Sequence, residues 1–499
     1  MSYTPPSWYP PGSAPKPPRR RRDHRWTLLA LGLALLVAAV SGTGWYLRGH
    51  DRPPAAAPPG TPAPGTSATT PAPGPSAVRS PTPVRVPGAE ELADARRPGE
   101  AAAWIADDTT DLPRRTIPVH TPWLVGGTVV QALYRELTAY RVADGTEAWN
   151  LPLPTPVCEA PVNPAPDGRI VLVLRSSDAE RGAKCDRLLM VDLRSGKPGW
   201  SKELRQTGTR DDTFLTHVAI SGDTLAVVQS MVATAYRVSD GSRLFGIPTE
   251  EPGRCHPDKV AGGARLLVSA TCGLDADHRR TSYQLRELDP RTGAVRWRHR
   301  TEPGKRIERV ISVDPVVYTL VDADRLADDW RIVALGPRGE VRRTIDARPK
   351  GFTHCAGAGI DADLQPCPGA FVAHGQVHLG GTDRVGSYDL ATGKLVQGVK
   401  ANDGRRLYPV HAESSKALVA YESAMPSSPG RLFRLDPSGA AGTKKDLLRF
   451  PAASAAVEYG TMAGRILYAD GRLFLAPSSV SGDDVLHQPR LLSFAPAPN

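Results

Sequence analysis

The chain has 499 residues and a formal net charge of +10, with 62 Lys and Arg against 52 Asp and Glu. The basic excess is local, because residues 1–90 hold 10 of the basic residues and only 3 of the acidic ones. The rest of the chain is close to neutral, so its composition argues against nucleic acid as a partner.

The N-terminal region has the pattern of a membrane anchor. Residues 1–25 are proline-rich and basic, and we expect them to form a cytoplasmic tail. The next segment, Trp26–Leu47, is uncharged over 22 residues, which is long enough to cross a bilayer as a helix. The positive-inside rule then places everything after Arg48 outside the membrane. The alternative is a cleaved signal peptide with its cleavage site near Val40–Gly42.

Residues 48–98 are expected to form an extracytoplasmic linker. Residues 52–88 contain 12 prolines among Ala, Gly, Ser and Thr. Such a composition cannot bury a core and favours an extended, semi-rigid chain.

A repeat with a period near 50 residues begins in the segment Ala139–Trp149. In each unit a strand ends in a polar residue and a glycine, and a bulky residue follows four positions later. Glycine with a short polar neighbour suits a tight hairpin turn. The clearest pairs are Gly145 with Trp149, Gly196 with Trp200, Gly241 with Phe245, and Gly293 with Trp297; weaker copies contain Gly339, Gly393 and Gly439.

This period, with several short strands in each unit, is typical of a β-propeller. Seven turn glycines indicate seven blades, and strands at 471–477 and 490–496 belong to an eighth unit without a fourth strand. The segment 99–108 around Trp104 resembles such a fourth strand. We therefore predict an all-β propeller over 99–499, with eight four-stranded blades and Trp104 in the closing strand; seven blades is the alternative.

The repeat resembles that of the pyrroloquinoline-quinone (PQQ)-type propellers, through the pattern Leu137, Ala139, Tyr140, Asp144, Gly145 and Trp149. That superfamily includes quinoprotein dehydrogenases and the non-enzymatic lipoprotein of the outer-membrane barrel assembly machinery. The anchor, the linker and the richness in Ala, Pro and Arg are similar to those of actinobacterial surface proteins.

The resemblance implies the fold more than an activity. For the dehydrogenases it implies adjacent cysteines beside the quinone and a calcium or lanthanide site, yet no two cysteines here are adjacent and no acidic cluster maps onto that site. We therefore expect no catalytic residues, no resident metal and no cofactor. The leading hypothesis is a membrane-anchored, non-catalytic binding or assembly platform for a protein, glycan or small ligand; the alternative is a PQQ-dependent oxidoreductase.

Several histidines fall near the expected inner strands and could line the central channel. A metal site would need three or four of them to converge on one point, and ordinary polar lining is the favoured interpretation. They are His120, His217, His256, His354, His374, His378 and His411.

All six cysteines lie in the segment assigned to the outside, where disulfides persist. An even number allows 15 complete pairings, and the expected blade positions favour the sequential one, because each consecutive pair lies at neighbouring strand ends or flanks one connection. We predict Cys158 with Cys185, Cys255 with Cys272, and Cys355 with Cys367.

Overall fold

The computed structural model describes residues 85–497, except for 108–109, 179–181, 251–253, 274–278, 325–328, 354, 356–362, 402, 436–442, 462–463 and 483–487. The expected tail, the segment Trp26–Leu47 and most of the linker lie outside the described residues. Within the described residues, no helix is long and apolar enough to span a bilayer.

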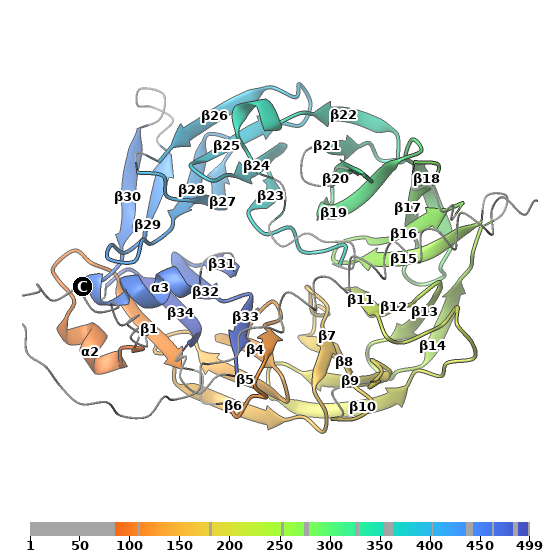
Figure 1. Cartoon of the computed structure of the whole chain (residues 1–499), viewed down its shortest axis with the longest axis horizontal. Coiled ribbons are helices and arrows are strands. Elements are labelled where there is room, and N and C mark those ends of the chain that lie inside the picture. The colour runs from red at the N-terminus through yellow and green to blue at the C-terminus, as the bar shows by residue number, and fades with distance from the viewer. Residues whose placement is uncertain are drawn as a thin grey trace, which may run out of the picture. The chain divides into compact units, whose positions relative to one another are not determined.

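Across the described residues the strands form eight four-stranded antiparallel sheets arranged as a ring (Figure 1). In blades 1 to 7 the strands follow one another outward in chain order. Blade 1 contains β3 (Trp123–Val125), β4 (Thr128–Leu133), β5 (Glu136–Arg141) and β6 (Glu147–Pro152); blade 2 contains β7 (Val157–Glu159), β8 (Arg169–Leu174), β9 (Arg187–Asp192) and β10 (Lys197–Glu203). Blade 3 contains β11 (Thr216–Ser221), β12 (Thr224–Gln229), β13 (Val232–Arg237) and β14 (Arg243–Ile247); blade 4 contains β15 (Cys255–Ala261), β16 (Leu266–Cys272), β17 (Ser282–Leu288) and β18 (Val295–Arg300).

The second half of the ring repeats the arrangement. Blade 5 contains β19 (Lys305–Val313), β20 (Val316–Asp322), β21 (Trp330–Leu335) and β22 (Val341–Ile345); blade 6 contains β23 (Ala370–Ala373), β24 (Gln376–Gly380), β25 (Arg384–Asp389) and β26 (Leu395–Lys400). Blade 7 contains β27 (Leu407–Ser414), β28 (Ala417–Glu422), β29 (Arg431–Leu435) and β30 (Lys444–Arg449); blade 8 contains β31 (Arg465–Ala469), β32 (Arg472–Ala476), β34 (Pro489–Ala495) and β1 (Ala102–Asp107).

Short elements complete the ring. A two-stranded ribbon pairs β2 (Thr116–Pro118) with β33 (Ser479–Ser481). The helices of the described residues are α2 (Ala89–Asp94) and α3 (Ala455–Gly460), with 3-10 turns η1 (Arg348–Lys350) and η2 (Ala452–Ser454).

The two ends of the propeller sequence meet in blade 8. Strand β1 pairs antiparallel with β34, and Trp104 lies opposite Ser493. The prediction that the strand around Trp104 closes an eighth blade is therefore confirmed, and the seven-blade alternative is wrong. Closure of this kind leaves no break in the ring at which an unpaired strand edge would be exposed.

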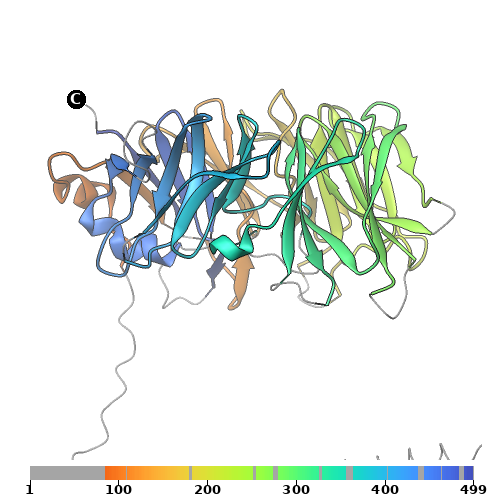
Figure 2. The same ribbon diagram turned by 90° about the horizontal axis from the view of Figure 1, so that it is seen from above.

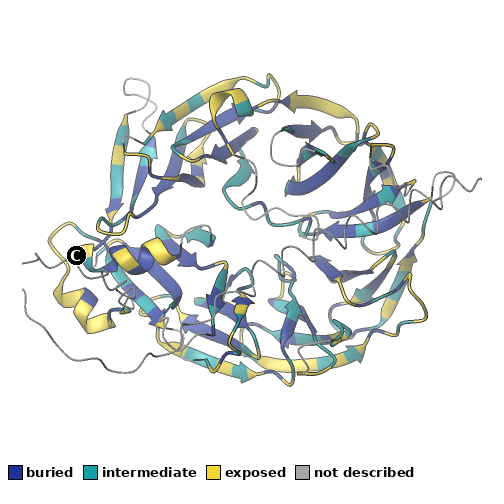
Figure 3. Cartoon of the chain, in the orientation of Figure 1, coloured by how far each residue is buried: buried dark blue, intermediate teal, exposed yellow. Residues whose placement is uncertain are grey.

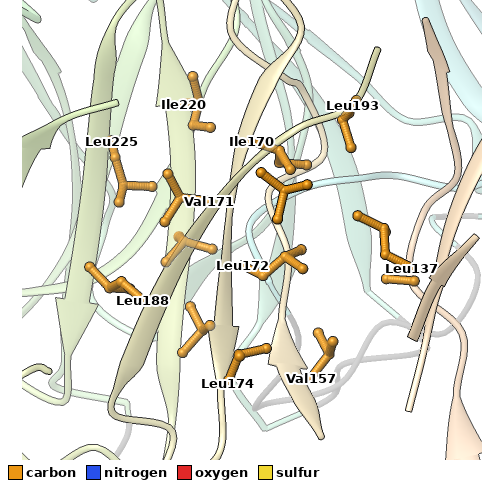
Figure 4. Packing of buried hydrophobic residues seen from close by; sticks show 14 of the residues in the cluster. Leu137, Val157, Ile170, Val171, Leu172, Leu174, Leu188, Leu193, Ile220 and Leu225 are labelled. Atoms are coloured by element: carbon orange, nitrogen blue, oxygen red, sulfur yellow. The ribbon is translucent and has the colours of Figure 1, made fainter. Parts of the chain in front are cut away.

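The core lies between the blades. Second strands such as β8 and β12 are buried along almost their whole length, whereas outer strands such as β10 are largely exposed (Figure 3). Figure 4 shows how Leu137 of blade 1, Ile170 to Leu174 of blade 2 and Leu225 of blade 3 contribute to one apolar cluster. These apolar layers explain why the second strands have uninterrupted apolar sequences instead of an alternating pattern.

The repeated glycine and bulky residue meet across the boundary between successive blades. Gly145 has a φ of +75°, and a Cβ atom built there would lie 2.5 Å from Cδ2 of Trp104 in the preceding blade. Trp149 covers Gly196, Trp200 covers Gly241, Phe245 covers Gly293 and Trp297 covers Gly339 in the same way. The turn therefore needs glycine for two reasons: its backbone is left-handed, and the aromatic ring of the preceding blade occupies the space where a Cβ atom would lie. Gly439, the weakest copy, lies outside the described residues.

All six cysteines are paired, in the combination that the sequence predicted: Cys158 with Cys185, Cys255 with Cys272, and Cys355 with Cys367. They lie on the face that carries the loops between blades and the loops between second and third strands, which we call the connection face. Figure 2 shows the ring edge-on, with loops gathered at its two faces.

Candidate binding site at the channel mouth

The connection between β22 and β23 runs against the inner strands of the ring. Leu364 is fully buried, and its carbonyl oxygen accepts a hydrogen bond from the backbone N–H of Val310 in β19, 2.7 Å away. The side-chain oxygen of Gln365 accepts a hydrogen bond from the backbone N–H of Gly262, next to β15, at 2.9 Å. The hydrogen-bond partners of residues 363–367 belong to the inner strands of several blades, and inner strands surround the central channel of a propeller. We therefore call these residues the channel segment.

Asp363 of the channel segment lies with Glu159 of β7 and His217 of β11. One ligand atom from each of the three residues lies within 4.8 Å of those of the other two. Nδ1 of His217 lies 2.6 Å from Oδ1 of Asp363. Burial, together with the charge of the neighbouring Asp363, raises the pKa of Glu159 well above its usual value. Burial would also raise the pKa of Asp363, but the hydrogen bond and charge of His217 hold that pKa below its usual value.

Two carboxylates and an imidazole are a donor set that could hold a divalent cation. Positive charge is already present, however. The guanidinium of Arg309 donates to the backbone oxygen of Asp363, and its charge lowers the pKa of the Asp363 carboxyl. The charge of Arg465 opposes protonation of Glu159. The three residues therefore fit a buried hydrogen-bonded ion-pair network that fastens the channel segment to blades 2 and 3 better than they fit a metal ion.

Among the described residues, the histidines predicted to line the channel do not meet three or four at one point. His217 joins the carboxylates and His256 lies in a neighbouring cavity. Burial lowers the pKa of His120 to about 4, with Asp363 opposing and Arg465 reinforcing the shift. The other described histidines, His374, His378 and His411, contact residues of blades 6 to 8, and His354 lies outside the described residues.

A cavity of about 390 Å³ opens beside this network on the connection face. The loop between β10 and β11 contributes Phe214 and Leu215, and the inner strands of blades 3 to 5 contribute His217, Lys259 and Arg306. It is therefore built by the blade-connecting loop and the inner strands of three adjacent blades, together with residues such as Met231 between β12 and β13, Thr271 of β16 and Tyr283 of β17. A second cavity of about 340 Å³ is lined by the channel segment and by inner strands of blades 5 to 8.

Phe214 and Leu215 stand out at the rim of the larger cavity. Their exposed fractions are 56% and 54%, although both are large apolar residues. The loop that carries them is held by hydrogen bonds: the carboxylate of Asp211 accepts from Thr207 at 2.6 Å, and Asp212 accepts from the backbone N–H of Phe214 at 2.9 Å. The exposure of the pair is therefore a property of an ordered loop.

The disulfide between Cys158 and Cys185 braces the same loop. The backbone N–H of Cys185 donates to the carbonyl of Thr213 at 2.8 Å, and the hydroxyl of Thr216 donates to the carbonyl of Cys185 at 2.9 Å. The exposed pair thus lies between two attachments to a crosslinked loop of blade 2.

Two cationic side chains extend from the inner strands into the cavity wall. Lys259 and Arg306 are each only 9% exposed. Burial lowers the pKa of Lys259, and the charges of Arg306 and Arg309 lower it further, against the opposite effect of Asp258 and Asp363. Nε and Nη2 of Arg306 are buried and find no hydrogen-bond partner among the described residues.

Sequence reasoning assigned no role to these side chains. Phe214–Leu215 carried a usable signal, since it is an adjacent apolar pair in the polar stretch TGTRDDTFLT. Arg306, Glu159 and Asp363 carried none, because blade packing alone brings them together.

Comparisons with known proteins agree with the repeat. A family model described as the outer membrane protein assembly factor BamB matches residues 92–256. No curated relative matches the sequence.

Solved structures with a similar arrangement include three proteins. BamB from Moraxella catarrhalis is 14% identical, with 80% of this chain and 98% of that chain covered and a TM-score of 0.44. A europium-containing methanol dehydrogenase is 12% identical, with 79% and 93% covered and a TM-score of 0.45. A quinohemoprotein alcohol dehydrogenase from Pseudomonas putida is 13% identical, with 84% and 85% covered and a TM-score of 0.44. The eight-bladed ring and the family match over residues 92–256 agree with a PQQ-like propeller repeat.

Proposed function

We propose that this protein is a membrane-anchored, extracytoplasmic platform that binds a protein partner at its connection face. The observation that carries the proposal is the ordered pair Phe214–Leu215, more than half exposed, at the rim of a cavity of about 390 Å³. Exposed large apolar side chains beside a cavity are typical of surfaces that another protein covers. A fixed loop also loses little conformational entropy on binding, which favours affinity.

The anchored, extracytoplasmic location rests on the sequence. The uncharged segment Trp26–Leu47 follows a basic tail, and the proline-rich linker would hold the propeller away from the membrane. Three disulfides in the propeller support the same location, since such bonds persist outside the cytoplasm.

An oxidoreductase that uses PQQ remains the alternative, and the side chains present do not fit it well. Every cysteine is crosslinked to a partner 12 to 27 residues away, so none forms the adjacent pair that the resemblance implies for the enzymes. The acidic pair Glu159 and Asp363 is engaged by His217 and by neighbouring guanidinium groups. We therefore derive no reaction for this protein.

Site-specific photo-crosslinking in intact cells tests the platform. A photoreactive residue in place of Phe214 should give a discrete protein adduct. The matched control is Val396 on the outer strand β26, which is 50% exposed and remote from the cavity. Equal adducts at the two positions, or none at position 214, would contradict the proposal.

The enzymatic alternative has its own assay. Purified full-length protein is mixed with PQQ and calcium, and dye reduction and thermal unfolding are followed. A platform should show neither turnover nor a saturable shift in Tm, and both together would establish the oxidoreductase instead.

A further inference from the structure

The cavity under Phe214 and Leu215 contains a buried guanidinium with two unused donors. Arg306 comes from β19 and lines the cavity wall. Its Nε and Nη2 atoms are buried without a hydrogen-bond partner among the described residues. Buried donors are normally paired, so an orphaned pair on a side chain that lines a cavity points to a group that the cavity receives.

The positions of Nε and Nη2 on the guanidinium indicate which kind of chemical group they can bind. Nε and Nη2 lie on the same edge of a guanidinium, and their N–H bonds point in nearly the same direction. This edge binds both oxygens of one carboxylate through two parallel hydrogen bonds. A neutral amide offers a single acceptor and a donor that would oppose one of the N–H groups.

The other charges of the cavity are consistent with an anionic ligand. Lys259, on the neighbouring inner strand, is a second buried basic side chain of the wall; burial lowers its pKa, and the charge of Arg306 lowers it further. Asp212 and Asp258 also line the cavity. The carboxylate of Asp212 is engaged by Phe214 N–H and by Gln206, and the charge of Asp258 favours the charged form of Lys259.

The rim determines the size of the ligand. A small dicarboxylate could reach Arg306 but would leave Phe214 and Leu215 uncovered. A polypeptide can occupy both places when an acidic side chain enters the cavity and a large apolar side chain packs on the exposed pair. The sequence of the bound polypeptide must therefore place an Asp or Glu close to a Leu, Ile or Phe in an extended segment.

Resting on the proposed platform function, we propose that this cavity binds an acidic side chain from an extended, acidic and apolar segment of the partner protein, with Nε and Nη2 of Arg306 forming the carboxylate clamp. Phe214 and Leu215 cover the apolar neighbour of that side chain. The proposal names the class of partner that the connection face selects.

The test uses purified full-length protein and fluorescein-labelled octapeptides, amidated at the C-terminus, in which one central Glu is flanked by Leu or Phe in all combinations. Each peptide has a partner with Gln in place of Glu. Some Glu peptides should bind in fluorescence anisotropy, and their Gln partners should bind about tenfold more weakly or worse, because the clamp loses one acceptor. Absence of binding by every Glu peptide, or equal binding of the Glu and Gln members, would overturn the proposal.

A third peptide set carries its only carboxylate at the C-terminus. Preferential binding of this set would show that the cavity takes a chain terminus, which also overturns the assignment to an acidic side chain. These comparisons use the unaltered protein, so they do not depend on whether a variant folds.

Variants then locate the contact. Arg306→Gln should abolish the Glu-over-Gln preference, and Arg306→Lys should weaken it, since an ammonium keeps the charge but not the fork. Arg434→Gln removes a surface arginine of blade 7 and should leave the preference intact. Circular dichroism confirms folding of each variant.

The two proposals fail in different ways. If the adduct at position 214 forms and exceeds that at position 396 while Glu and Gln peptides bind alike, the platform stands and the carboxylate clamp does not. If the clamp preference is present but the adduct at position 214 equals that at position 396, the platform surface has been misplaced. Retention of the preference in Arg306→Gln would contradict the role given to Arg306.

Discussion

The contact between Trp104 and Gly145 closes the ring, and removing it provides a quantitative test of the fold. Trp104 is 5% exposed, and its indole N–H donates to the carbonyl of Val142 at 3.1 Å. It comes from the N-terminal strand β1, whereas Gly145 and Val142 belong to blade 1. The contact therefore couples the closing strand to the next blade of the ring.

The magnitudes follow from two separate costs. Gly145→Ala forces a left-handed φ on alanine, which costs about 1–2 kcal/mol, and its Cβ would lie 2.5 Å from the indole. Displacing the indole costs up to the value of Trp104→Ala, about 3–5 kcal/mol. Gly222 is the matched control, because its φ is +61° and a Cβ there meets nothing within 4 Å. Gly222→Ala should therefore show the backbone cost of about 1–2 kcal/mol alone.

The decisive measurement is a double-mutant cycle. Once the indole has been removed, alanine at position 145 no longer meets it. The double variant should therefore be less destabilised than the sum of the single variants by about 3 kcal/mol. Urea unfolding of the oxidised full-length protein, followed by far-UV circular dichroism, gives these differences from midpoints at constant slope. Equal effects of Gly145→Ala and Gly222→Ala, or strict additivity in the double variant, would refute the account of ring closure.

Three other outcomes are expected. Burial raises the pKa of Glu458 from 4.5 to about 7, so the native state holds an extra proton between these values and the free energy of unfolding falls as pH rises through them. Glu458→Gln should make the free energy of unfolding less dependent on pH in this range. If the difference in that free energy between the variant and the unaltered protein is the same at pH 4.5 and at pH 7, the raised pKa does not belong to Glu458. Replacing Cys158 and Cys185 by serine should cost about 3–4 kcal/mol and weaken the position-214 adduct, while replacing Cys355 and Cys367 should leave the adduct closer to normal. A reporter that is active only when it folds outside the membrane should be active when it is fused after Gly60. Recovery of a soluble mature protein that begins near Thr43 would instead show that the segment is a cleaved signal peptide.

The sequence was sufficient to predict the blades because each one repeats a local chemical requirement. Position 145 must be glycine because its turn needs a left-handed backbone and because the indole ring of Trp104 fills the space where a Cβ atom would lie. The requirement is therefore visible in the residue type. The same reasoning predicted the closing role of Trp104. Where the pattern weakened, the structure uses a different side chain: Arg343 lies over Gly393, and its guanidinium donates to the carbonyl of Ala391 at 2.7 Å.

The channel segment could not be predicted from the same pattern. It belongs to a long irregular connection between β22 and β23, which has no period to mark its path. Asp363 meets His217, which is 146 positions away in the chain, and no short-range pattern indicates such a contact. The absence of an acidic cluster in the sequence was therefore no guide to the structure, because Glu159 and Asp363 become neighbours only when the ring is complete.

The positions of the disulfides indicate which part of the propeller has covalent support. The blade-to-blade contacts already hold the strands through packing, and none of the three crosslinks joins two blades directly. Each one lies instead on the connection face beside the candidate site: Cys185 supports the loop of Phe214, Cys255 and Cys272 join the strand that carries Lys259 to its neighbour, and Cys367 ends the channel segment. Loops on this face lack the hydrogen-bonded ladder of a sheet, and a crosslink reduces the conformations from which a binding surface must be selected. Covalent bracing beside the candidate site is expected of a surface that must be presented to a partner in a fixed form, in addition to the stability that each crosslink gives the propeller.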